Sequence, residues 1–192
     1  MPVQIEITVN MQPFEQALER LARSSLDMAP VMRDIAGLLE RETDDNFRAQ
    51  GRPPWKPLAQ ATILGRLMGR DKDGKSKGLG SILNRQGDLR VSARRKLEGG
   101  MAILQDTGTL RGSIRAFSDG GSATIGAAKV KTRSGSTLDY AAIHQFGGKA
   151  GRGRKVTIPA RPFLPVDREG NLSPEAEKGV LAAILDHLAR SV

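Results

Sequence analysis

Tyr140-Ala141-Ala142-Ile143-His144-Gln145-Phe146-Gly147-Gly148 is the most informative stretch of this 192-residue chain. Tyr140, Ile143, His144 and Gly147 are three or four residues apart, so they share one face of a predicted helix, which the glycine pair ends. A small-residue loop precedes the stretch, and a basic glycine-rich loop follows it. Such an apolar element between two loops is typical of a contact between subunits or of a buried structural helix, and both interpretations stay open.

Upstream of this stretch, the sequence predicts one strand followed by two helices. Residues 3–9 alternate between apolar and polar side chains, which is the pattern of a half-buried strand. Residues 14–21 and then residues 31–39 repeat their apolar positions at helical spacing, with Pro30 in the first turn of the second helix. We interpret the acidic run at residues 40–45 as a solvated face and helix end, in preference to a metal site.

A proline-rich loop with the only tryptophan follows at residues 50–58. Its prolines exclude regular helix, and Trp55 is predicted to be either a buried lid on the core or an anchor at a subunit contact. Leu58, Ala61, Leu64 and Met68 indicate a short helix. Residues 70–98 are rich in glycine and lysine, and we expect a flexible basic insertion without regular structure in the isolated chain.

The second half of the chain alternates between strand and helix signals. Residues 113–117 and 123–127 are β-like runs that flank Asp119, Gly120 and Gly121, a hairpin turn signal. Residues 156–166 read as an extended segment whose three prolines confine it to a sheet edge or to an arm. Ser173 and Pro174 begin a closing helix with an expected buried face of Val180, Leu181, Ile184, Leu185 and Leu188.

This order of elements predicts a single α+β domain spanning residues 1–192. We expect an antiparallel β-sheet with helices packed on one side, together with long loops and an extended proline-rich arm. Aromatic residues make up only 4% of the chain, and 22 glycines and 10 prolines accompany them. Loops of this kind often become ordered only against neighbouring molecules.

Composition also limits the chemistry that the chain can perform. It has no cysteine and two histidines, so a disulfide or a thiolate metal site is excluded and a protein-built zinc site is not expected. No apolar run approaches the roughly 20 residues that a bilayer span requires, and the first ten residues lack the pattern of a secretory signal. We therefore expect a soluble protein without cofactor, metal ion or membrane contact.

The positive charge is concentrated in one part of the sequence. Residues 48–100 contain thirteen Lys or Arg against four acids, whereas the remainder has seventeen of each. Such a segment points to contact with an acidic surface or with nucleic acid. No aromatic residues interleave with the cations, so base stacking is not implied, and a solvated or partner-ordered loop remains the competing interpretation.

A catalytic site is not indicated by any motif. His144 with Asp106 or Asp139 and Ser113 can be drawn as a nucleophilic triad, but no strained nucleophile turn precedes a helix. A histidine on an amphipathic helical stretch is more often a hydrogen-bonded structural residue. The glycines of residues 147–153 lack the order of a phosphate-binding loop.

Three short sequence segments, which we call phrases and which follow one another in a fixed order, resemble those of a known family. They are residues 103–111 with Ser113 and Ile114, residues 140–148, and residues 158–164, whose sequence is Ile158-Pro159-Ala160-Arg161-Pro162-Phe163-Leu164. Together with residues 55–58 and Thr62, they resemble the phage virion morphogenesis family, which is similar to the tail completion proteins of P2-like phages. The resemblance covers most of the chain, but the basic segment is longer than the family leads us to expect.

The resemblance implies a non-enzymatic structural protein of the phage neck or tail end, assembled in the host cytoplasm. It implies a homo-oligomeric ring, expected to be hexameric, that completes the tail and supports head-tail joining. The implied partners are further copies of the chain, the tail tube, head-tail connector proteins and packaged DNA through non-specific phosphate contact. The alternative is a head-side connector or capsid assembly factor that contacts DNA through its basic segment.

Two groups of candidate site residues follow from these patterns. The candidates for subunit contacts are exposed anchors on short elements beside loops: Trp55, Tyr140, Ile143, His144, Phe146, Phe163 and Leu164. The candidates for contact with a DNA channel or with an acidic partner are cations of the basic segment: Arg85, Arg90, Arg94, Arg95 and Lys96.

Overall fold

The computed structural model describes residues 27–128, 130–131, 137–138, 140–151, 153 and 155–190, together with Gln16, Glu19 and Ala22. The strand expected at residues 3–9 lies outside these described residues, as do the side chains of residues 130–131, 137–138 and 140. Of the first expected helix, Gln16 and Glu19 are described and helical.

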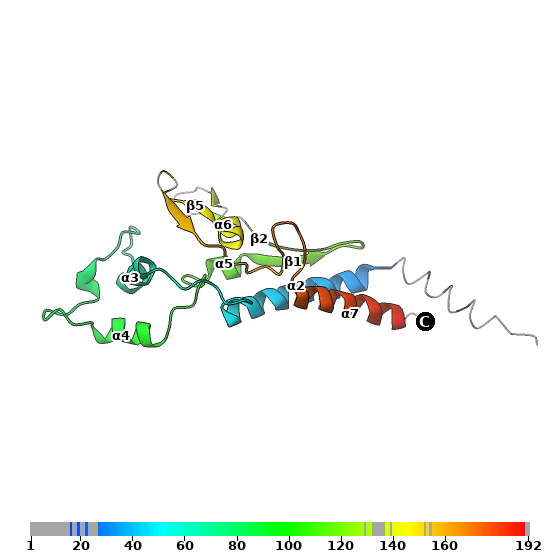
Figure 1. Ribbon diagram of the computed structural model, residues 1–192, viewed down its shortest axis with the longest axis horizontal. Helices are drawn as coiled ribbons and strands as arrows, with labels where there is room; N and C mark the ends of the chain where they lie inside the picture. The colour runs from blue at the N-terminus through cyan, green and yellow to red at the C-terminus, as the bar shows by residue number, and fades with distance from the viewer. Residues whose placement is uncertain are drawn as a thin grey trace, which may run out of the picture.

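The molecule is elongated, with α2 (Ala29–Ala49) and α7 (Pro174–Arg190) side by side at one end and α3 (Gln60–Met68) and α4 (Val91–Glu98) at the other (Figure 1). Between these ends lie α5 (Thr109–Gly112), β1 (Ile114–Ser118), β2 (Ala123–Ala127), β3 (Val130–Lys131), β4 (Thr137–Leu138), α6 (Tyr140–Phe146), β5 (Gly148–Ala150) and β6 (Val156–Ile158). None of the helices in the described part of the chain has the length and apolar character needed to cross a bilayer.

Helix α2 is the longest element and connects two separate cores. Pro30 occupies its first turn, and the Asp27 Oδ1 atom accepts the backbone N–H of Ala29 at 3.3 Å. Val31, Ile35 and Leu39 form a buried stripe against α7, as the spacing predicts. The helix continues through the acidic run to Phe47, which belongs to a second core.

The predicted α+β class is confirmed, and the strands of the described residues form three separate two-stranded antiparallel hairpins. The β1–β2 hairpin packs on α2, with Ile114 opposite Ala127 and Ser118 opposite Ala123. Asp119 shapes its turn because the carboxylate accepts the N–H groups of Gly121 at 2.9 Å and Ser122 at 2.7 Å. The predicted hairpin is therefore confirmed, including the position of its turn.

Helix α7 begins where the sequence predicts, with the Ser173 Oγ atom accepting the N–H of Ala176 at 3.3 Å. Its buried face differs from the expectation. Ala176, Val180 and Ile184 pack against α2, whereas Leu181 and Leu185 are each 57% exposed. The reason is that α2 is the only helix that packs along α7 among the described residues, so a narrow stripe is covered and the adjacent leucines remain outside it.

Residues 59–101, which we call the basic lobe, begin with α3, the short helix that the sequence predicts, and contain further regular structure that the sequence pattern did not predict. The 3₁₀ turn η1 (Leu79–Ser81) and α4 lie within them, and Leu67, Ile82 and Ala93 form a small core. Asp71 and Asn84 stabilise the loops, since each side-chain oxygen accepts two backbone N–H groups. The flexibility expected for residues 70–98 stays a prediction.

Candidate functional site

The resemblance-bearing phrases meet around three aromatic rings at the C-terminal end of α2, a place that we call the motif junction. Phe47 and Phe163 are each 0% exposed, and their ring centroids lie 5.6 Å apart. Trp55 packs edge-on against Phe47 at 5.8 Å. Leu110 and Ile114 complete the cluster, so residues distant in sequence share one core.

The proline-rich segment at residues 159–165 runs through this junction and does not project as a free arm. Its prolines remove backbone donors, so its remaining polar groups need side-chain partners. The indole Nε1–H of Trp55 donates to the carbonyl of Pro162 at 2.9 Å. The amide of Asn46 donates to the carbonyl of Phe163 at 3.1 Å. These two bonds fasten the segment to α2 and to the tryptophan loop.

The buried side chain of Gln145 makes the largest number of the hydrogen bonds described for this segment. Its Oε1 atom accepts the N–H groups of Phe163 at 2.9 Å and Leu164 at 3.0 Å. Its Nε2 atom donates to the carbonyls of Leu164 at 3.2 Å and Val166 at 2.8 Å. The side chain thus replaces the hydrogen bonds that a neighbouring strand would supply, and it fixes α6 to the proline-rich segment.

Two glycines permit the close packing of the junction. Gly147 has φ +72°, and a Cβ atom there would lie 2.9 Å from the backbone nitrogen of Ala160. Gly51 has φ +100°, and a Cβ atom there would lie 2.4 Å from the indole Cδ1 of Trp55. Both positions therefore require glycine for conformation and for space.

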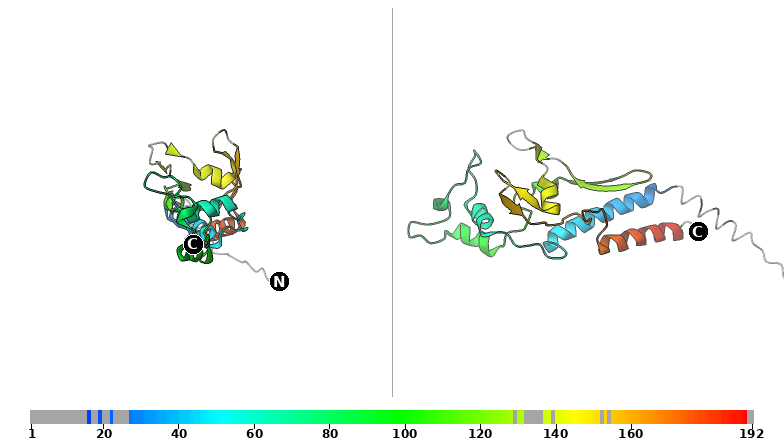
Figure 2. Two further views of the ribbon diagram at one scale, coloured as in Figure 1. Left: turned by 90° about the vertical axis from the view of Figure 1, so that its left-hand side faces the viewer. Right: turned by 45° about the horizontal axis from the view of Figure 1, so that its top comes forward.

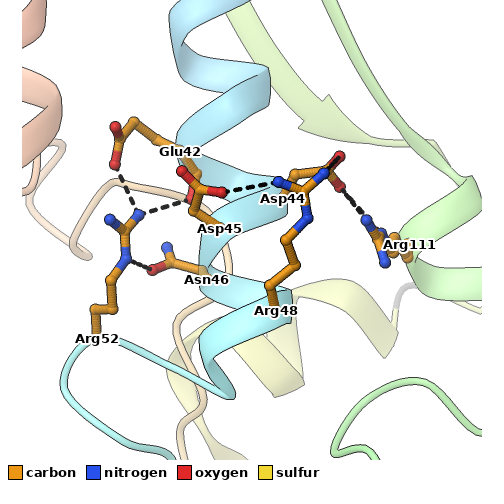
Figure 3. Close-up of polar contacts among 7 residues, drawn as sticks. All are labelled: Glu42, Asp44, Asp45, Asn46, Arg48, Arg52 and Arg111. Atoms are coloured by element: carbon orange, nitrogen blue, oxygen red, sulfur yellow. Dashed lines mark hydrogen bonds and ion pairs between the residues drawn. The ribbon is translucent and has the colours of Figure 1, made fainter.

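Arginine side chains form ion pairs with acids of the run at residues 40–45 of α2 (Figure 3). The guanidinium of Arg52 contacts the Glu42 carboxylate at 2.7 Å and donates to Asn46 Oδ1 at 3.1 Å. Arg111 contacts Asp44 at 2.9 Å, and its guanidinium lies 5.9 Å from the centre of the Phe47 ring. This supports the non-metal interpretation of the run. No cluster of His, Cys, Asp or Glu that could hold a metal ion occurs within the described residues.

A cavity of about 900 Å³ opens beside the junction, between the start of the basic lobe and the β5–β6 hairpin. Its lining includes Leu104, His144, Ile158 and Arg161. The Arg161 guanidinium donates to the carbonyls of Lys56 at 3.1 Å and Pro57 at 3.2 Å, which ties the tryptophan loop to the proline-rich segment. Burial, and secondarily the positive charge of Arg161, lowers the pKa of His144, which favours the neutral imidazole.

Two side chains of the possible triad, those of Ser113 and Asp106, have other partners. Ser113 donates its hydroxyl to the carbonyl of Leu110 at 2.7 Å, and Asp106 lies 3.5 Å from the guanidinium of Arg66. Asp139 lies outside the described residues. The described geometry thus gives Ser113 a structural contact rather than a base to activate it.

The candidate contact residues occupy different environments. Trp55 and Phe163 lie in the core, which agrees with the lid interpretation of Trp55. Ile143, His144 and Leu164 are half-buried. Phe146 is 38% exposed, with the guanidinium of Arg168 at 5.6 Å from its ring, and the side chain of Tyr140 lies outside the described residues. The assignment of these residues to subunit contacts stays a prediction.

The candidate cations all belong to the basic lobe, and they do not play the same part. Arg90 holds the lobe together, because its guanidinium donates to the carbonyls of Leu83 at 2.8 Å and Gly80 at 3.2 Å. Arg94, Arg95 and Lys96 are exposed on α4, and Arg85 is exposed on the loop before it. Their contact with DNA or with an acidic partner stays a prediction.

Sequence reasoning missed the polar side chains that hold the junction together. Gln145 and Gln105 were part of the quoted phrases but received no role. Gln105 donates to the carbonyl of Phe47 at 3.1 Å, and Gln50 donates to the same carbonyl at 2.7 Å. A glutamine between apolar residues on a short helix, followed by a proline-rich segment, is the signal that could have revealed Gln145.

Comparisons with known proteins identify the family of this chain. The family model described as "Phage virion morphogenesis family" matches residues 9–99 and 84–189. The chain is 36% identical over 185 residues to the Mu-like prophage FluMu G protein 2 of Haemophilus influenzae. The aligned residues cover 96% of this chain and 95% of that protein. No solved structure matches the chain. With the family model spanning most of its length, this chain belongs to the phage virion morphogenesis family.

Proposed function

We propose that this virion morphogenesis protein completes the phage tail as a homo-oligomeric ring at the neck or tail end and supports head-tail joining. It acts through assembly rather than catalysis. Its partners are further copies of itself, the tail tube and head-tail connector proteins. Membership of the virion morphogenesis family along most of the chain is the observation that carries the proposal.

The surface of the chain supports an assembling role. Large apolar side chains are exposed on several separate elements, including Phe117 on β1, Phe146 on α6 and Leu181 on α7. Single exposed apolar side chains are normal on a monomer, so the pair Leu181 and Leu185, four residues apart on α7, carries this argument. The elongated outline in Figure 1 gives each of these elements its own part of the surface. A subunit that contacts more than one neighbour has this kind of surface.

A second candidate function is a head-side connector or capsid assembly factor that contacts DNA. The exposed cations Arg85, Arg94, Arg95 and Lys96 favour it, because such residues neutralise phosphates without reading sequence. The two candidates differ in the virion part that first accepts the protein. Tail completion requires binding to tails before heads are present, whereas a head-side connector requires binding to heads.

An order-of-addition experiment distinguishes these candidates. Heads and tails are isolated separately from phage whose copy of this gene is disrupted, and the purified chain is added to one or to the other before mixing. Native mass spectrometry measures the mass of the chain with and without tail tubes, and plaque titre measures completed particles. We expect a mass increase with tail tubes and a full titre after preincubation with tails. Binding to heads alone would favour the second candidate, and binding to neither would contradict both.

The contact role of α6 is tested through Phe146, because replacement of the core residue Phe163 would damage the fold itself. Phe146→Ala removes an exposed ring, so the protein should fold but lose incorporation into particles. Val156→Ala is the matched control, since it removes an exposed apolar side chain from β6, outside α6 and the basic lobe. Folded Phe146→Ala protein that enters particles as well as the native chain would remove α6 from the proposal.

A further inference from the structure

The two ends of the molecule carry opposite charge. The basic lobe contains ten Lys or Arg and four Asp or Glu, a net charge of +6. At the other end, α2 with Asp27 and α7 with the turn before it contain eleven acids and six cations, a net charge of −5. Figure 2 shows these two regions at opposite ends of the long axis in its right-hand view. Arg52 and Arg111 contact Glu42 and Asp44 from outside the helix pair and bring this end to −3, so the two ends still carry opposite charge.

Each end also exposes apolar side chains among its charges. On the basic lobe, Val91 is 66% exposed and lies one helical turn from Arg94 and Arg95, and Leu79 is exposed nearby in sequence on η1. On α7, Leu181 and Leu185 are four residues apart and exposed on the same face. Protein interfaces typically have an apolar centre and a charged rim, and both ends have this composition. Cations alone would also suit DNA binding, but the exposed apolar side chains favour a protein partner.

Only some of the acids of the α2–α7 helix pair form ion pairs. Glu42, Asp44 and Asp45 contact arginines at the C-terminal half of α2, and Asp186 contacts Arg190 on α7. Within the described residues, Asp34, Glu40, Glu175 and Glu177 take part in no ion pair. Of these, Glu177 lies one helical turn before Leu181, so negative charge remains available beside the exposed leucines of α7.

We propose that the basic lobe of one copy docks on the α2–α7 helix pair of the next copy. This inference rests on the proposed ring, and it identifies the surfaces through which neighbouring subunits of that ring bind each other. Opposite charges at opposite ends make the contact heterologous, so each copy donates its lobe to one neighbour and its helix pair to another. A heterologous contact produces a ring when its rotation closes. The charges speed encounter and fix the orientation, and the apolar side chains supply the burial.

The docking is tested with one variant for each side of the contact. Arg94→Glu with Arg95→Glu reverses charge on the lobe, and Leu181→Asp places a charge in the apolar face of α7. All three residues are exposed, so both variants should fold, which circular dichroism verifies. Each variant alone should remain a single subunit of 20.7 kDa under conditions in which the native chain assembles. The comparison is made on tail tubes if the native chain assembles only there.

A mixture of the two variants gives the sharper result. One variant retains a native helix pair and the other a native lobe, so they can form one contact and no more. We expect the mixture to stop at two subunits by native mass spectrometry, and high salt should dissociate this pair. A symmetric contact through a single surface patch would instead limit the native chain itself to two subunits. The matched control is Lys149→Glu with Lys155→Glu, which reverses two exposed cations on the β5–β6 hairpin and should assemble as the native chain does.

Three outcomes would overturn the docking. The first is native-like assembly of either variant, which leaves the proposed ring in place but removes this contact from it. The second is a lobe variant that assembles normally yet loses retention of duplex DNA, which assigns the cations to phosphate binding. The third is a native chain that stays a single subunit both alone and with tail tubes, which contradicts the ring as well as the docking.

Discussion

The motif junction and the basic lobe differ in how completely each one is held by its own residues. In the junction, three aromatic rings are buried and the backbone of residues 159–166 is bonded by Trp55, Asn46 and Gln145. In the lobe, the small core consists of Leu67, Ile82 and Ala93, and the loops rely on local turns. The junction is thus a structural centre, whereas the lobe has only a small core of its own.

The difference also explains where the family resemblance lies in the molecule. The phrases at residues 103–111, 140–148 and 158–164 all supply residues to the junction. The lobe lies between residues 55–58 and the first of these phrases, and it contains none of the three. Motifs that recur in a fixed order therefore mark the part of the chain where side chains from distant segments must fit together.

Replacement of Phe163 should produce the largest loss of stability. The ring is 0% exposed and packs on Phe47, so Phe163→Ala leaves a cavity in the junction and should cost about 3–5 kcal/mol. Urea unfolding followed by tryptophan fluorescence measures it, since Trp55 is in the same cluster. Phe146→Ala is the control and should cost about 1 kcal/mol or less, because that ring is partly exposed. Equal costs for the two variants would contradict the junction as the structural centre.

Gln145→Leu should have the next largest effect. The leucine keeps the approximate volume, but the N–H groups of Phe163 and Leu164 lose their acceptor in a buried setting. We expect a loss of about 2–4 kcal/mol, measured by urea unfolding. Gln86→Leu is the matched control, because Gln86 is exposed in the basic lobe and its replacement should be nearly neutral. A cost for Gln145→Leu no greater than the control would show that the proline-rich segment is held by packing alone.

Ile82→Ala tests the independence of the lobe. Ile82 is the centre of a small core, so its truncation should loosen residues 59–101 while the junction keeps its packing. The global cost should be only about 1–2 kcal/mol, less than for a junction residue, because the lobe opens locally before the rest unfolds. Hydrogen exchange measures this directly: amides of α4 should exchange faster, and those of α2 should not. Faster exchange in both regions would show that lobe and junction form one cooperative unit.

The sequence predicted elements whose signals are local. The Asp119-Gly120-Gly121 turn, the Ser173 cap and the apolar stripe of α2 depend on residues close together in the chain, and each is confirmed. The burial of Leu181 and Leu185 was predicted wrongly, because periodicity shows that a helix has an apolar face without showing how much of it a neighbour covers. The class of the fold followed from these local signals.

The arrangement of the candidate site could not be predicted in the same way. Gln145 meets residues 163–166, Trp55 meets Pro162, and Arg111 meets Asp44, and each pair is separated by a long stretch of sequence. Pairing at such distances depends on the packing of α2 against the second half of the chain. The order within the basic lobe was missed because its apolar residues are widely spaced and its turns are closed by side-chain hydrogen bonds.

The smallest effect concerns pH and the cavity beside the junction. Burial first, and the charge of Arg161 second, hold the pKa of His144 below its ordinary value of about 6.5. The unfolded chain therefore takes up this proton at higher pH than the folded chain does, so the stability that neutral His144 provides is present above about pH 6.5 and is lost as the pH falls through the lower folded pKa. We expect the urea midpoint of the native chain to decline between about pH 7.5 and pH 5.5.

His144→Gln should reduce this decline, because glutamine does not titrate. The comparison of its slope with the native slope assigns the difference to the group beside the cavity. If the decline persists undiminished in His144→Gln, the pH dependence originates elsewhere in the molecule.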